Sequence, residues 1–84
     1  MPRVDVSVRE LQDLLNEALS DDGNDCEVLP GNILVLDQPD ASGCNWDYAM
    51  DPGLPILRGR ITQDSERALH RAVRMLKDTH NVSP

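Results

Sequence analysis

The chain has 84 residues, 39% of them hydrophobic, and its 15 acidic residues against eight Lys and Arg give a net charge of −7 at pH 7. This length suits one core, so we expect residues 1–84 to form a single domain. No apolar run is long enough to cross a membrane or to form a secretory signal, and the acidity disfavours nucleic acid as a partner. We therefore expect a cytoplasmic protein with no membrane partner.

The segment DVSVRELQDLLNEALSDDG, residues 5–23, predicts a helix that begins at Ser7. Ser7 is followed three residues later by Glu10, which is the capping-box pattern, and Gly23 suits a left-handed cap at the other end. The apolar residues of the segment recur at spacings of three and four, which places them on one face of a helix. They are Val8, Leu11, Leu14, Leu15, Ala18 and Leu19.

Short apolar runs after this helix predict extended segments. Residues 28–29 and 33–36 are separated by Pro-Gly-Asn, so we expect a hairpin with a tight turn. A loop follows over residues 37–43. Cys44, Trp46 and Tyr48 then alternate with polar residues, which predicts a third strand that presents these three side chains on one face.

The remaining sequence predicts an irregular crossing and a second helix. Residues 51–57 contain prolines and a glycine, which exclude a regular element, and we expect the crossing to tuck Leu54, Ile56 and Leu57 against the body. Thr62 or Asp64 then caps a helix that runs to about Thr79. We expect the chain outside the two helices to be short and frayed at both ends.

The order helix, strand, strand, strand, helix predicts an α+β fold. Two amphipathic helices would pack on one face of a small antiparallel sheet and leave its other face exposed. Double-stranded-RNA-binding domains share this order, but such domains engage phosphates. Here the first helix and the sheet are the acidic part of the chain, so the likeness stops at topology.

The stretch GCNWDYAMDPG, residues 43–53, holds both aromatic residues of the chain. Large aromatic side chains contribute the most buried area per residue, so Trp46 and Tyr48 are candidates for the core. Trp and Tyr are also enriched at binding hot spots, so the alternative is that the pair forms a contact patch on the exposed sheet face, with Asp47 and Asp51 at its rim. The sequence leaves both interpretations open.

The tetrapeptide Gly-Cys-Asn-Trp, residues 43–46, precedes a C-terminal helix that leads into the pair Asn81 and Val82. In these features the C-terminal half of the chain is similar to short uncharacterised bacterial proteins. The resemblance implies a small bacterial or phage-associated protein of unassigned activity. It assigns no catalytic or binding residue.

The sequence offers few residues for catalysis or metal binding. The possible soft ligands are Cys26, Cys44, His70 and His80, and neither the cysteines, 18 residues apart, nor the histidines, 10 apart, form the close pairs of a zinc site. No phosphate-binding or metalloprotease motif occurs. We expect two free thiols, no metal, no cofactor and no enzymatic activity.

Charge is divided along the chain. Residues 1–57 carry a net charge of −10, whereas residues 58–84 carry +3, mainly through Arg67, Arg71 and Arg74 in the second predicted helix. These arginines are candidates for contact with an acidic partner or with phosphates. The alternative is that they pair with acids of the same chain or keep one helix face hydrated.

Three hypotheses of function remain. The leading one is a small non-enzymatic bacterial protein that binds another protein or itself, with the divided charge permitting self-association. The second is an acidic antagonist that presents carboxylates in place of phosphates to a basic nucleic-acid-binding protein. The third is a redox or hydrolytic enzyme that uses Cys44, although a cysteine on a buried strand normally behaves as a small inert hydrophobe.

Overall fold

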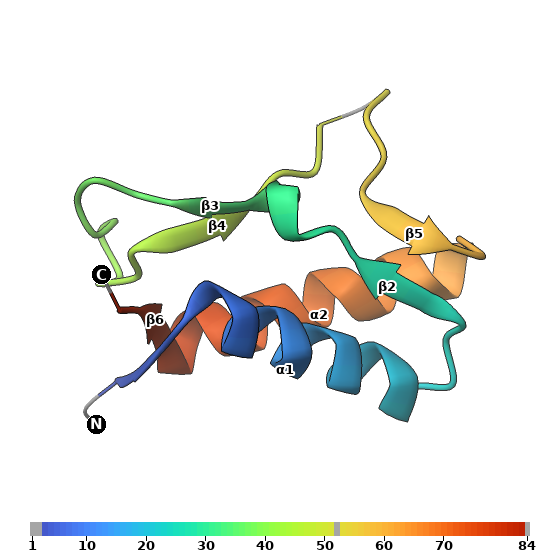
Figure 1. Ribbon diagram of the computed structural model, residues 1–84, viewed down its shortest axis with the longest axis horizontal. Helices are drawn as coiled ribbons and strands as arrows, with labels where there is room; N and C mark the ends of the chain where they lie inside the picture. The colour runs from blue at the N-terminus through green and yellow to red at the C-terminus, as the bar shows by residue number, and fades with distance from the viewer. Residues whose placement is uncertain (1–2, 52, 84) are drawn as a thin grey trace.

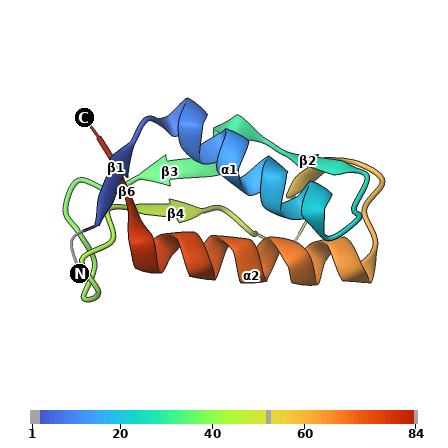
Figure 2. The same ribbon diagram turned by 90° about the horizontal axis from the view of Figure 1, so that it is seen from below.

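A computed structural model describes residues 3–51 and 53–83, and it shows an α+β protein built in two layers (Figure 1). Helices α1 (Val8–Asp21) and α2 (Gln63–Thr79) lie side by side and run in opposite directions; we call them the helix layer (Figure 2). Most of the strands lie above the helices in Figure 1. The strands are β1 (Val4–Val6), β2 (Cys26–Val28), β3 (Ile33–Val35), β4 (Trp46–Tyr48), β5 (Leu57–Gly59) and β6 (His80–Val82).

Both helices begin and end where their capping residues predict. The Ser7 hydroxyl accepts a hydrogen bond from the backbone N–H of Glu10 at 3.1 Å, and Gly23 follows α1 with a φ of 77°. The Thr62 hydroxyl caps α2 by accepting from the N–H of Ser65, whose hydroxyl accepts from the N–H of Thr62 at 2.6 Å. These contacts satisfy N–H groups that have no partner within a helix. The predicted helices are therefore confirmed.

Four strands form one long two-stranded ribbon with a break in the middle. β2 pairs with β5 and β3 pairs with β4, both antiparallel. The predicted hairpin between residues 28–29 and 33–36 is wrong, because β2 and β3 do not pair with each other. They follow one another along one side of the ribbon, and β4 and β5 form the other side. The Pro-Gly-Asn segment forms a single 3-10 turn, η1 (Pro30–Asn32), which joins two extended residues without reversing the chain.

The ends of the described chain are paired rather than frayed, which corrects a second expectation. β1 and β6 form a parallel ladder in which Val4 lies opposite His80 and Val6 opposite Val82. The Arg3 guanidinium ties this ladder to α2 and to the loop before β4 by donating to the carbonyl oxygens of Lys77 at 2.6 Å and Ser42 at 3.0 Å. The strands thus form three two-stranded ladders, and the order differs from the single three-stranded sheet that the sequence predicts.

The tetrapeptide at residues 43–46 holds β6 in place. The side-chain amide of Asn45 accepts from the N–H of Val82 at 2.8 Å and donates to its carbonyl oxygen at 2.7 Å, as a neighbouring strand would. The Asn81 side chain donates to the carbonyl oxygen of Gly43 at 3.1 Å. The two sequence features behind the resemblance to bacterial proteins therefore contact each other, and in this fold their contact is structural.

The crossing between β4 and β5 is partly as predicted. Leu57 is buried and Ile56 packs against the core, but the Leu54 side chain is 60% exposed, so its expected burial is wrong. Residues 51 and 53–56 lie outside the ladders and outside both helices, whereas Leu57, which the sequence assigned to the irregular crossing, begins β5. Leu54 therefore extends into solvent while the residues nearer β5 join the core.

Gly59 ends β5 in a conformation that other residues rarely adopt. Its φ is 100°, and a Cβ added there would lie 2.9 Å from the carbonyl oxygen of Asp25. We expect Gly59→Ala to lower the free energy of unfolding by more than about 1 kcal/mol, because both the dihedral angle and the close approach oppose a side chain. Urea unfolding measures this. Gly31→Ala is the matched control, since a Cβ at Gly31 meets nothing within 4 Å. Equal stability of the two variants would contradict the prediction.

Candidate functional site

The structure places Trp46 and Tyr48 in the core, so they do not form the exposed contact patch that was one interpretation of the sequence. The Trp46 side chain is 0% exposed and Tyr48 is 4% exposed. The Trp46 indole N–H donates to the carbonyl oxygen of His80 at 2.9 Å. The face of β4 that carries both rings packs toward the helix layer, because a chain with no Phe has few other large groups to fill its core.

The two acids expected at the rim of that patch are exposed, whereas both aromatic residues are buried. Asp47 alternates with Trp46 and Tyr48 on β4 and is therefore exposed on the opposite face. Its carboxylate accepts from the Lys77 ammonium at 3.2 Å. Asp51 is exposed in the crossing beyond β4. Because both aromatic residues are buried, neither carboxylate borders an exposed aromatic surface.

Asp40 organises the loop that leads into β4. One of its carboxylate oxygens accepts from the hydroxyl of Ser42 at 2.6 Å, from the N–H of Ser42 at 2.9 Å and from the N–H of Cys44 at 3.1 Å. These hydrogen bonds, first that from the Ser42 hydroxyl, hold the pKa of Asp40 below its ordinary value. The carboxylate thus fixes the loop in its charged form.

This lowered pKa predicts a pH dependence of stability at Asp40. A folded-state pKa below the unfolded-state pKa of about 3.9 stabilises the folded protein at pH values above that unfolded-state pKa. This stabilisation is lost as the pH falls through the folded-state pKa of Asp40. We expect the stability difference between the wild type and Asp40→Asn to be greatest near neutral pH and to shrink in acid. Urea unfolding at a series of pH values tests this, and a difference that stays constant down to strong acid would contradict it.

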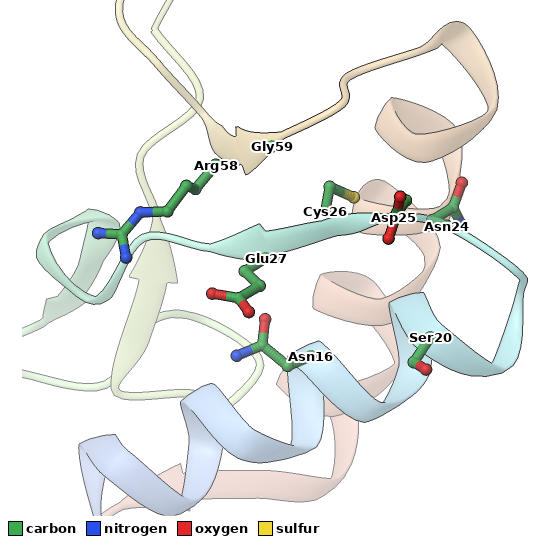
Figure 3. Close-up of a pocket in the computed structure, with 8 residues that line it drawn as sticks. All are labelled: Asn16, Ser20, Asn24, Asp25, Cys26, Glu27, Arg58 and Gly59. Carbon is green, nitrogen blue, oxygen red and sulfur yellow. The ribbon is translucent and has the colours of Figure 1, made fainter.

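A polar groove of about 470 Å³ lies between α1, β2 and β5 (Figure 3). Asn16 extends from α1 toward β2, where its side-chain oxygen accepts from the N–H of Val28 at 2.7 Å. Glu27 and Arg58 are cross-strand neighbours, but Arg58 points away and no ion pair joins them among the residues described. Burial raises the pKa of the Cys26 thiol, which disfavours the reactive thiolate. The Cys26 thiol therefore ionises less readily than an ordinary cysteine thiol.

Cys44 is still less accessible than Cys26. Its side chain is 0% exposed, and the thiol donates to the carbonyl oxygen of Trp46 at 3.2 Å. Both cysteines are free. Within residues 3–51 and 53–83, no three His, Cys, Asp or Glu side chains gather as a metal site would require, and no helix there is long and apolar enough to cross a bilayer.

The outer surface of the helix layer carries the divided charge that the sequence shows. Exposed acids follow α1 at spacings of three and four residues, which places them on one face opposite the buried leucines. We call this acidic stripe Glu10, Asp13, Glu17 and Asp21. On α2 the exposed arginines follow the same spacing and form the Arg stripe, which is Arg67, Arg71 and Arg74.

The two stripes make little contact with each other or with the rest of the described chain. Arg71 pairs with Asp22 at 3.1 Å near the end of α1, and both side chains are largely exposed. The remaining ion pairs among the described residues join Lys77 to Asp40 and Asp47. Within the part of the chain that the structure describes, the alternative that the arginines pair with acids of the same chain therefore holds for Arg71 alone.

Met75 belongs to the same surface, although the sequence did not single it out. It follows Arg71 by one helical turn, and Arg71 marks the side of α2 that faces α1. The Met75 side chain is 58% exposed. In the sequence, Met75 directly precedes Leu76, which is buried. That position alone does not distinguish an exposed methionine from one in the core. An apolar side chain thus lies at the seam between the oppositely charged helices.

No protein-family model, no curated protein and no solved structure matches the chain. The fold and its surface define a small α+β domain with buried aromatic and thiol groups and a helix layer of divided charge. The helix layer is the candidate site, because it gathers the Arg stripe, the acidic stripe and Met75 on one face.

Proposed function

We propose that the protein acts without enzymatic activity, in the bacterial cytoplasm, by binding another protein through the outer face of its helix layer. The observation that carries this proposal is the presence of two oppositely charged stripes side by side, with no ion pair between them among the described residues. Charges in such an arrangement match a partner of complementary pattern, and they orient and accelerate its approach.

The seam between the stripes supports the same function. Specific interfaces combine a small apolar centre with a polar rim, and methionine adapts its shape to the surface it meets. Met75 supplies an apolar group, and the arginines beside it supply the residue type most suited to planar carboxylate contacts. The surface thus contains both parts of an interface, in a region that the core does not use.

Retention of proteins from a lysate of the source cells tests the proposal. The wild type, immobilised on a resin, should retain a partner that the double variant Arg71→Glu with Arg74→Glu loses. The matched control is Arg58→Glu with Arg60→Glu, which makes the same charge change in and beside β5 of the strand layer. The proposal fails if the wild type retains no protein or if the helix-layer variant retains the same protein as the control.

The acidic antagonist is a second candidate because the acidic stripe forms no ion pair within the described chain. A mimic of phosphates would use α1 and would not need the Arg stripe. Reversal of Glu17 and Asp21 to lysine should then abolish binding while reversal of Arg71 and Arg74 leaves it intact. Added DNA should also compete for the partner, and binding should fall steeply with salt.

A further inference from the structure

We infer that the partner of the helix layer is a second copy of this chain, packed face to face about a two-fold axis that runs parallel to the helices. This inference rests on the proposed function and names its partner. It commits to a single arrangement, because the charge pattern distinguishes the two simplest ways of placing one helix layer on another.

Charge complementarity selects the direction of the axis. A two-fold axis across the helices would place α1 on α1 of the second copy, and so set acids against acids. An axis parallel to the helices places α1 on α2 of the second copy and α2 on its α1, so that each acidic stripe meets an Arg stripe. Two-fold interfaces are isologous, and each favourable contact therefore occurs twice.

The ion pair between Arg71 and Asp22 fixes the positions along the axis. It places the Arg71 guanidinium beside the carboxylate of Asp22, the capping residue at the end of the antiparallel α1, and we take this as the common level of the two helices. Because a helix rises about 1.5 Å per residue, Arg74 lies about 4.5 Å further along, toward the start of α1. In the two-fold arrangement, Arg74 then lies opposite the space between Glu17 and Asp21 of the second copy.

The seam lies on the same axis. Rotation about an axis parallel to the helices does not change the position of a residue along the helices. A residue at the seam therefore meets its own copy, so Met75 approaches Met75 of the second copy. This contact covers a side chain that is 58% exposed in the single chain. The two methionines form the apolar centre, and the opposed stripes form the rim.

One contact in this arrangement is unfavourable, and it provides a sharp test. Asp78 lies one turn beyond Arg74 and seven residues beyond Arg71 on α2, so it is level with Leu15 of α1, between Asp13 and Glu17. It therefore approaches the exposed Asp13 and Glu17 of the second copy. Asp78→Lys should strengthen self-association, which is a gain that loss of folding does not produce.

Sedimentation velocity over a concentration series, at about 0.15 M ionic strength, measures the association. We expect wild-type dimers, at least about tenfold weaker dimers for Arg71→Glu with Arg74→Glu and for Glu17→Lys with Asp21→Lys, and tighter dimers for Asp78→Lys. An equimolar mixture of the two weakened variants should restore the dimer, since the substituted residues of each variant then face residues of opposite charge on the other. Arg58→Glu with Arg60→Glu should dimerise as the wild type does.

Two results overturn the inference. One is that the wild type and Asp78→Lys both remain monomeric at protein concentrations up to about 1 mM, which is the weakest dissociation constant of interest. The other is dimerisation that the stripe variants leave unchanged or that their mixture does not restore. In either case the lysate experiment separately decides the proposed function, because a different partner protein would still be retained by the Arg stripe.

Discussion

Replacing Trp46 with alanine should lower the free energy of unfolding by about 3 to 5 kcal/mol, the largest effect we expect for one substitution in this chain. The Trp46 side chain is 0% exposed and is among the largest groups of the core. Its removal leaves a cavity that the surrounding side chains fill only in part. It also leaves the carbonyl oxygen of His80 without the indole N–H that donates to it.

Urea unfolding followed by circular dichroism measures this loss. Tryptophan fluorescence cannot follow the variant, because Trp46 is the only tryptophan of the sequence. Trp46→Phe retains a ring but not the N–H, and we expect it to cost less than the alanine variant. Leu54→Ala is the exposed control, since Leu54 is 60% exposed, and we expect its free energy of unfolding to change by no more than about 0.5 kcal/mol. In the wild type, Trp46 fluorescence should be blue-shifted and protected from acrylamide at every protein concentration. A red-shifted, quenchable Trp46 would contradict its place in the core.

Tyr48→Phe should lower the free energy of unfolding by about 1 to 3 kcal/mol, although it removes a single oxygen atom. The Tyr48 hydroxyl accepts from the N–H of Leu29 at 3.0 Å and donates to the carbonyl oxygen of Ile56 at 2.6 Å. Leu29 and Ile56 come next in register after the β2–β5 ladder, so the hydroxyl bridges the break in the ribbon. Without it, two backbone groups lose their partner.

Alkaline pH provides a second test of this bridge. Burial raises the pKa of Tyr48 above its ordinary value of about 10. A raised folded-state pKa contributes stability that is complete below the unfolded-state value and is lost as the pH rises through the folded value. The stability difference between the wild type and Tyr48→Phe should therefore narrow at strongly alkaline pH. A difference that persists unchanged there would exclude the neutral hydroxyl as the bridge.

The sequence predicts the helices well because their signals are local. Ser7, Thr62 and Gly23 each act within one helical turn of their own position. The alternation around Trp46 is equally local, and it correctly groups Cys44, Trp46 and Tyr48, which the structure shows to be buried. Local patterns are thus sufficient to predict each element that is stabilised by contacts between residues close in the sequence.

The pairing of the strands depends on contacts that no local pattern contains. The hairpin prediction failed because Pro-Gly-Asn suits both a reversing turn and the 3-10 turn that forms. β1 and β6 were missed because three-residue strands show no clear alternation, and Asn45 and Arg3 hold them from distant parts of the chain. For the helix layer, the sequence identified the Arg stripe, but only the structure shows which of its members lacks an internal partner.

The parallel ladder of β1 and β6 has a mechanical consequence. Val4 lies opposite His80 and Val6 opposite Val82, so the chain enters the ladder at one end and leaves it at the other. A force that pulls residues 3 and 83 apart therefore slides the two strands past each other and loads their hydrogen bonds together. An antiparallel pair in the same place would open one bond at a time. Stretched along its ends, this small domain should resist force by shear.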